Sequence, residues 1–399
     1  MKIQLSDHFT YKMLLRFVLP SIIMMVSTSI YGVVDGLFVS NFVGKTPFAA
    51  VNLVMPFIMV FGGIGFMFGT GGSALVAKTM GEGDKHRANQ YFTMIIAATL
   101  ICGVIISTLG VIFMEPISVF LGADAEMLPD CVLYGRIVLA FNTAYMLQNV
   151  FQSFLIAAEK PKLGLWVTVA AGVTNMALDA LFIAVFHWGV AGAAIATVSA
   201  QLISTVGCFI YAFAHYPNIR LKKEDWHITM HDVRRHVSRG IPLGLQFSVL
   251  AVGIIVMQGG VVQFDMLDGR MVSNAAQNGF GAANKLNSLV MTPMNALGTA
   301  MTSFTAQNLG AGRYDRIKKG TLQAMVLMGV IMALAVSIGM LLTIDQLYLH
   351  VFLSADKVTE ETIRYGNTFL YVDFAMFPFL GFIFSIRNCV QGIGKSSFV

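Results

Sequence analysis

The segment from Phe17 to Gly44 is the feature that most restricts how this chain can fold. It holds one charged residue, Asp35, and it is long enough to cross a bilayer, which takes about 20 residues. A carboxylate in hydrocarbon costs at least roughly 2.5–3.5 kcal/mol, so acids inside membranes usually face a cavity, a partner or an ion path. Asp35 is therefore the first candidate functional residue, unless it lies near enough to the helix end to be solvated.

The chain as a whole has the same apolar character. It is 56% hydrophobic and only 12% charged, whereas a soluble domain is typically about 25% charged. The composition therefore predicts an all-α polytopic membrane protein. Apolar runs and turn residues predict ten spans, near residues 14–42, 47–78, 90–114, 131–158, 163–186, 190–214, 240–263, 274–306, 320–344 and 362–392.

The basic residues predict the orientation. Of the 26 Lys and Arg residues, 20 lie in alternate connections that include the N-terminus, five lie in the opposite loops, and Lys285 lies inside a span. By the positive-inside rule, the N-terminus is cytoplasmic and the protein is a multi-pass protein of a cytoplasmic (inner) membrane. The net charge of +5 thus reflects topology, and we expect no nucleic-acid partner. The four cysteines show no C-x-x-C spacing, so we expect neither a zinc site nor a disulfide framework.

An internal repeat divides the chain into two halves. Ala77–Gly83 recurs as Ala306–Gly312, and each copy ends a span before a basic stretch. Further matches are Pro20 with Pro242, Val119–Asp124 with Val351–Asp356, and Tyr134-Gly135 with Tyr365-Gly366. The repeat predicts two pseudo-symmetric six-helix bundles in parallel topology, an arrangement found in transporters.

The predicted domains follow from this repeat. They are an N-terminal six-helix lobe (1–216), an amphipathic cytoplasmic linker (217–239) and a C-terminal lobe (240–399) with four of six helices. Because the sequence stops where the eleventh span should begin, we expect it to be incomplete or truncated.

Four polar residues of the first half lie at one predicted depth. Asp35 is ten residues before Lys45, Asp179 is eight residues before His187, and Thr197 is eight residues after Gly189, which places all three about 12–15 Å from one membrane face. Asn175 lies one turn from Asp179 on the same helix face. The sequence predicts that these residues lie in one layer of the membrane, although a common depth alone does not make the side chains face each other.

The chemistry of such a cluster leaves three interpretations open. Two carboxylates in a low-dielectric pocket resist double ionisation, so one of them can carry a proton. Together with Asn175 and Thr197, they also offer hard oxygen ligands for a small cation such as sodium. The third interpretation is an inter-helix hydrogen-bond cluster that serves assembly alone.

These features resemble the multidrug and toxic compound extrusion (MATE) transporters, in particular a bacterial branch related to the DNA-damage-inducible MATE proteins and the staphylococcal multidrug efflux type. The motifs that carry the resemblance are the Pro20 to Asp35 interval, Asn175-x-x-x-Asp179, Gly192-Ala-Ala-Ile-Ala-Thr197 and Gln307-Asn-Leu-Gly-Ala-Gly312. The resemblance implies a V-shaped pair of six-helix bundles. It also implies that Asp35, Asn175, Asp179 and Thr197 bind substrate and the coupling ion.

The second half departs from a pattern described in another MATE branch, in which a Glu follows the proline of span 7 by eight residues. Here that residue is Leu250, and the counterpart of Asp35 is Met257. We therefore expect ion coupling mainly in the N-terminal lobe. Secondary candidates in the C-terminal lobe are Asp373, Gln246, Gln258 and Lys285, of which Lys285 either supplies a countercharge or snorkels to the outer face.

The resemblance implies export of lipophilic organic cations and drugs by antiport with protons or sodium through alternating access. It requires no cofactor beyond the coupling ion, and we expect a monomer whose partners are small cationic drugs and membrane lipid. The alternative is a flippase for a lipid-linked saccharide, which an acidic cavity disfavours because pyrophosphate calls for Arg or Lys. A membrane enzyme is disfavoured because no span carries H-E-x-x-H or G-x-S-x-G.

Overall fold

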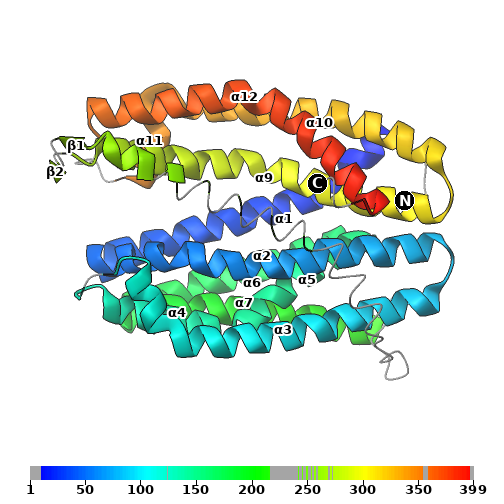
Figure 1. Ribbon diagram of the computed structural model, residues 1–399, viewed down its shortest axis with the longest axis horizontal. Helices are drawn as coiled ribbons and strands as arrows, with labels where there is room; N and C mark the ends of the chain where they lie inside the picture. Colours follow the sequence, from blue (N-terminus) through cyan, green and yellow to red (C-terminus); the bar gives the residue numbers. More distant parts are fainter. Residues whose placement is uncertain are drawn as a thin grey trace.

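The computed structural model describes residues 10–123, 125–215, 259–267, 270–271, 273–353 and 358–395, together with six helical residues between 241 and 257. The predicted linker 217–239 lies outside the described residues, as does most of the predicted span 240–263. The regular secondary structure of these residues is helical apart from one short hairpin (Figure 1). This confirms the predicted all-α class.

The N-terminal half consists of long helices joined by short turns. They are α1 (Tyr11–Phe38), α2 (Lys45–Gly81), α3 (Lys85–Phe120), α4 (Leu128–Ala140), α5 (Asn142–Ala157), α6 (Pro161–Asp179) and α7 (Gly189–His215), with π-helical segments at Val39–Val43 and Ala180–Val185. The predicted span 131–158 is not one helix. Phe141 leaves helical geometry (φ −109°, ψ 12°) and separates α4 from α5.

The C-terminal half contains the antiparallel strands β1 (Met266–Leu267) and β2 (Arg270–Met271), which follow helical residues that end at Gln263. The helices that follow are α9 (Ala275–Gly310), α10 (Tyr314–Thr343), a 3-10 turn (Ile344–Gln346), α11 (Leu347–Phe352) and α12 (Glu360–Ile393). Across the described residues of both halves, seven helical segments are long and apolar enough to cross a membrane. The helix α9 is not among them, because polar residues such as Asn278, Lys285 and Asn295 interrupt its apolar sequence.

The outward faces of the helices are apolar. On α3 and α10, the exposed large side chains include Ile101, Ile112, Leu334 and Ile338. A contiguous apolar surface of this kind marks a membrane or protein interface rather than a surface that faces water. Together with the length of the helices, it is what a bilayer-spanning protein requires.

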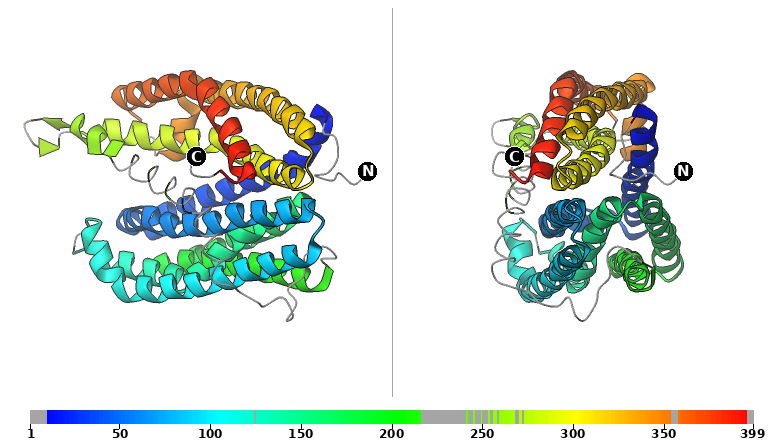
Figure 2. Two further views of the ribbon diagram at one scale, coloured as in Figure 1. Left: turned by 45° about the vertical axis from the view of Figure 1, so that its right-hand side comes forward. Right: turned by 90° about the vertical axis from the view of Figure 1, so that its right-hand side faces the viewer.

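Each half has its own apolar core, and α1 contributes to both. The first turns of α1, with Leu14, Phe17 and Val18, belong to the core cluster of α9, α10 and α12. Its end leads into Val39, which packs in the core that holds Val54 of α2. The helix α1 therefore runs from one half to the other, as the side views also show (Figure 2).

The two copies of the repeated motif meet where α2 and α9 end, and we call this side of the molecule the repeat-motif end. A Cβ atom on Gly81 would collide with the carbonyl oxygen of Gln307, and one on Gly310 would collide with the carbonyl oxygen of Lys78. Ala77 and Ala306 lie beside them in a cluster of small buried residues. Only glycine permits this approach, which explains why both copies of the motif carry one. The opposite side, where β1 and β2 lie, is the hairpin end (Figure 1).

Candidate functional site: a buried acid pair

Asp35 and Asp179 are neighbours in the interior of the N-terminal half. Asp35 in the last turn of α1 is 5% exposed and Asp179 at the end of α6 is 0% exposed. Their carboxyl groups interact directly with each other. The structure thus brings together the two acids that the sequence places at one depth.

The local backbone is unusual at both acids. The π-helical segment Val39–Val43 begins one turn after Asp35, and the segment Ala180–Val185 begins directly after Asp179. Such wider turns are rare and are often found at functional sites. Both acids therefore lie at the point where a regular helix gives way to a locally widened backbone.

A glycine allows the two acid-bearing helices to approach. The ring of Tyr31 on α1 packs against Gly172 of α6, where a Cβ atom would lie 2.9 Å from the tyrosine Cδ1. Tyr31 precedes Asp35 by one turn, and Gly172 precedes Asp179 by about two turns. A larger residue at Gly172 would therefore push apart the helices that hold the acid pair.

The polar atoms around the pair have unused hydrogen-bonding capacity. Apart from their contact with each other, Asp35 Oδ1 and both Asp179 carboxyl oxygens have no hydrogen-bond partner among the described residues. The amide of Asn175, which is 1% exposed, also has none in that part of the chain. A buried polar group without a partner costs roughly 1–3 kcal/mol. These oxygens are thus suited to a bound cation, a shared proton or ordered water.

Thr197, the fourth predicted site residue, makes no direct hydrogen bond to the other three. It lies on α7, which packs against α6, and its side chain is half-buried. No hydrogen bond connects Thr197 with Asp35, Asn175 or Asp179, all of which lie in the described part of the chain. The geometry therefore supports a core of Asp35, Asn175 and Asp179, with Thr197 on the adjoining helix.

Sequence reasoning missed Tyr134 as a member of the site. This residue of α4 is 0% exposed, its hydroxyl has no hydrogen-bond partner among the described residues, and the charges of both Asp35 and Asp179 act on it. Its only signal in the sequence is that Tyr134-Gly135 recurs as Tyr365-Gly366. A phenol beside two carboxyl groups can donate a hydrogen bond to either of them.

The two secondary candidates that lie among the described residues, Asp373 and Lys285, do not form a matching site in the C-terminal half. Asp373 on α12 is half-buried, with one carboxyl oxygen lacking a partner among the described residues. Lys285 on α9 is exposed, and its ammonium lies over the rings of Phe48 and Phe352. Gln246 and Gln258 lie outside the described residues. Within the described residues, no ion pair joins Asp373 to Lys285.

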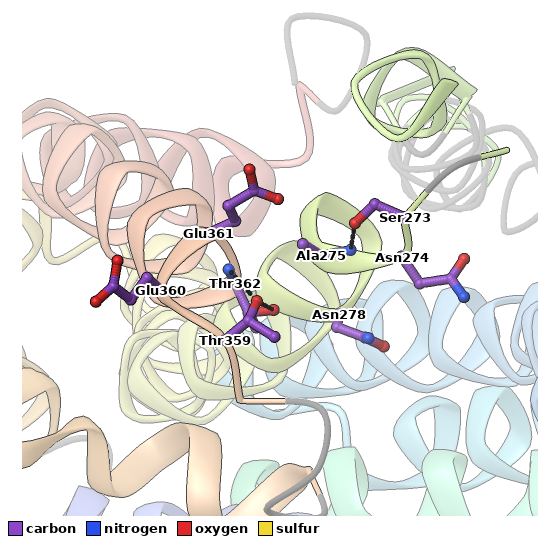
Figure 3. Close-up of a pocket in the computed structure, with 8 residues that line it drawn as sticks. All are labelled: Ser273, Asn274, Ala275, Asn278, Thr359, Glu360, Glu361 and Thr362. Atoms are coloured by element: carbon purple, nitrogen blue, oxygen red, sulfur yellow. Dashed lines mark hydrogen bonds between the residues drawn. The ribbon is translucent and has the colours of Figure 1, made fainter. Parts of the chain in front are cut away.

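A separate pocket of about 400 Å³ lies at the hairpin end, between the first turns of α9 and α12 (Figure 3). Two of its polar side chains cap these helices. Ser273 Oγ accepts a hydrogen bond from the Ala275 amide at 3.0 Å, and Thr359 Oγ1 accepts one from the Thr362 amide at 3.2 Å. None of the candidate site residues lines this pocket. We therefore assign it a structural role at the two helix starts.

Comparison with known families gives a match over most of the chain. The family model described as MatE matches residues 20–181 and 253–399. Among solved structures, one titled as the outward-facing conformation of a multidrug resistance MATE family transporter is similar with a TM-score of 0.88 and 21% identity. The match covers 98% of this chain and 84% of that one. At this identity, the structural similarity shows the fold alone.

Three curated proteins illustrate the range of relatives. The probable multidrug resistance protein YoeA of Bacillus subtilis is 24% identical over 89% of this chain and 75% of its own length. A FAD transporter of Shewanella oneidensis is 26% identical over 78% of this chain and 68% of its own length. The multidrug export protein MepA of Staphylococcus saprophyticus is 25% identical over 50% of this chain and 45% of its own length.

Proposed function

This chain belongs to the MatE family, whose members are transporters and not enzymes, and we propose that it exports lipophilic organic cations in exchange for protons or sodium. The family resemblance inferred from the sequence motifs is thereby confirmed. In this proposal, the protein acts as a monomer in a cytoplasmic membrane, with its N-terminus in the cytoplasm. Its cargo is small cationic drugs that reach it from the cytoplasm or the lipid.

The observation that carries this proposal is the acid pair. Asp35 and Asp179 are buried side by side, and apart from their contact with each other Asp35 Oδ1 and both Asp179 carboxyl oxygens lack hydrogen-bond partners among the described residues. Two adjacent buried carboxylates cost free energy unless a cation or a proton compensates their charge. A site that must always hold a positive charge can exchange one cation for another, which is the requirement for antiport.

The proposed cycle follows from competition for this site. A cationic substrate binds near Asp35 and Asp179 while the transporter is open to the cytoplasm. After the halves rock, protons or sodium ions bind the pair and displace the substrate, because the same carboxylates do not neutralise both cations. The contact of Gly81 and Gly310 would close the repeat-motif end in one state and separate in the other.

The name of one relative, a FAD transporter, suggests anionic cargo, which makes a flavin nucleotide a second candidate. The observation in its favour is the alignment with the FAD transporter of Shewanella oneidensis over 78% of this chain. A flippase for a lipid-linked saccharide is a further alternative. Both cargoes carry pyrophosphate, and two buried carboxylates disfavour its binding at the Asp35–Asp179 site.

The experiment is transport in proteoliposomes that contain the chain, with the proton gradient and the sodium gradient imposed separately. We expect uptake of a fluorescent organic cation to require one of the two gradients and to be lost in Asp35→Asn. Uptake that is indifferent to both gradients would contradict the antiport. FAD is tested as a competitor, and strong competition with no cation transport would favour the flavin nucleotide.

A further inference from the structure

Lys285 places a positive charge opposite the half that carries the acid pair. It lies ten residues after the start of α9, which is about 15 Å along the helix. Asp35 lies ten residues before the start of α2, at a similar distance from the hairpin end. One half thus contributes carboxylates and the other contributes an ammonium at comparable depth.

The ammonium of Lys285 contacts an aromatic ring from each half. Its Nζ atom lies 5.8 Å from the ring centroid of Phe48 in the first turn of α2 and 5.7 Å from that of Phe352 at the end of α11. These are cation–π distances. The side chain therefore stands between the two halves.

The Phe48 ring connects Lys285 to the acid-bearing segment. A Cβ atom on Gly36 would lie 3.6 Å from Phe48 Cε2, so the ring packs against the residue that follows Asp35. A single aromatic ring thus separates the lysine ammonium from the stretch of α1 that carries the acid. The order along this line is ammonium, aromatic ring and acid. A ligand with an anionic group, an aromatic ring and a cationic group in sequence would match it.

Among the described residues, no carboxylate forms an ion pair with Lys285. The single ion pair among the described residues joins Lys78 to Glu82, at the repeat-motif end. Lys285 is exposed as a residue, so a ligand group can approach its side chain beside the two rings. An ammonium at this depth is costly without a counter-charge, and an anionic ligand group would supply one.

We propose that Lys285 binds the carboxylate of zwitterionic aromatic substrates, whose cationic group lies toward Asp35 and Asp179 and whose ring lies against Phe48 and Phe352. The proposal rests on the export function proposed above and narrows its substrate class. Lys285 then selects among substrates, while the acid pair couples their export to the ion gradient. Removal of the lysine charge is expected to affect only substrates that carry an anionic group.

The test uses two dyes that differ in one group: a rhodamine with a free carboxylate and the methyl ester of the same rhodamine. Export of each dye is measured from cells or proteoliposomes with the wild-type chain, Lys285→Met and Lys285→Arg. Met keeps most of the side-chain length without the charge, whereas Arg keeps the charge. Lys319→Met is the matched control, because Lys319 is an exposed lysine at the repeat-motif end.

We expect Lys285→Met to lower export of the carboxylate dye roughly ten-fold, as the loss of one charge-assisted contact would, while export of the ester changes less than about two-fold. Lys285→Arg should restore most of the lost export of the carboxylate dye. Lys319→Met should alter the export of neither dye. An equal loss for both dyes, or no loss for either, would overturn the proposal.

Dye binding to the purified protein separates this inference from the proposed function. If the wild-type protein binds both dyes and exports neither, the export function is wrong and the binding ratio decides the role of Lys285. A weaker affinity of Lys285→Met for the carboxylate dye alone supports the site. An unchanged ratio of the two affinities refutes it, and gel filtration of each variant shows that the protein is folded.

Discussion

The two halves of this protein share a repeat but differ in where they carry charge. In the N-terminal half, Asp35 is buried beside Asp179. The counterpart of Asp35 in the C-terminal half is Met257, which is 49% exposed. Likewise, Tyr134 is buried beside both acids, whereas its counterpart Tyr365 is half-buried and lies near Phe264 and Arg364.

The contact between the two repeat copies is, in contrast, symmetric. Gly81 approaches the backbone of one repeat copy and Gly310 approaches the backbone of the other in the same way. Packing at the repeat-motif end therefore constrains both copies equally. A buried acid pair is costly, and one pair suffices to exchange one cation. The comparison teaches that the repeat preserves helix packing at this end, while the adjacent buried acids of the described residues lie in the N-terminal half.

The largest effect is expected from Asp35→Asn. This change removes a charge that the proposed exchange requires, so we expect export of organic cations to fall by about 100-fold or more, which corresponds to about 2.7 kcal/mol. Dye efflux measures the loss, and the amount of protein in the membrane should stay unchanged. Normal efflux by this variant would remove the distinction between the halves.

Asp179→Asn sharpens the comparison by testing whether the acids act together. We expect a loss comparable to that of Asp35→Asn, and the double variant should lose little more than either single variant, because residues in direct contact are not additive. Efflux and cation binding are measured for all three. If the fold-losses of the two single variants multiply in the double variant, the two acids act independently.

The symmetric contact is tested at Gly310. Gly310→Leu should prevent the approach of the halves at the repeat-motif end and lower efflux roughly ten-fold, because the new side chain would meet the Lys78 carbonyl. Gly81→Leu should have the same effect, since its contact with Gln307 is equivalent. Gly312→Asn is the control: Gly312 has a positive φ of 68° in an exposed turn, which Asn tolerates. Unequal effects at Gly81 and Gly310 would contradict the symmetry.

A smaller effect is expected from substitution of Tyr134, compared with its repeat counterpart Tyr365. Tyr134→Phe removes a buried hydroxyl on which the charges of both acids act. If it donates to a carboxylate or a bound ligand during transport, efflux should fall roughly three- to ten-fold, as for a hydrogen bond of about 0.5–1.5 kcal/mol. The same change at its counterpart, Tyr365→Phe, should alter efflux by less than about two-fold. Equal losses at the two positions would argue against a special role of Tyr134.

The smallest effect is expected from Asp373→Asn. Asp373 is half-buried on α12 and no ion pair joins it to another described residue. We expect a change in efflux of about two-fold or less, which is typical of a substitution outside a tight network. A loss as large as that of Asp35→Asn would place a second coupling site in the C-terminal half.

Much of this organisation could be predicted from the sequence. Long apolar runs predicted the helices, the repeat identified two motif copies that meet in the structure, and helix rise placed Asp35 and Asp179 at one depth. Local patterns did not reveal the break at Phe141 or the π-helical segments, because both depend on packing between helices. Tyr134 was missed for the same reason, since its role depends on which helix face meets the acids.

The most direct test of the central claim is to measure ion displacement when a cationic dye binds the purified protein. If the acid pair exchanges one cation for another, the dye should release protons or bound sodium from the wild-type chain, and Asp35→Asn should release neither. Dye binding of equal strength in both proteins, with no ion released, would contradict the account.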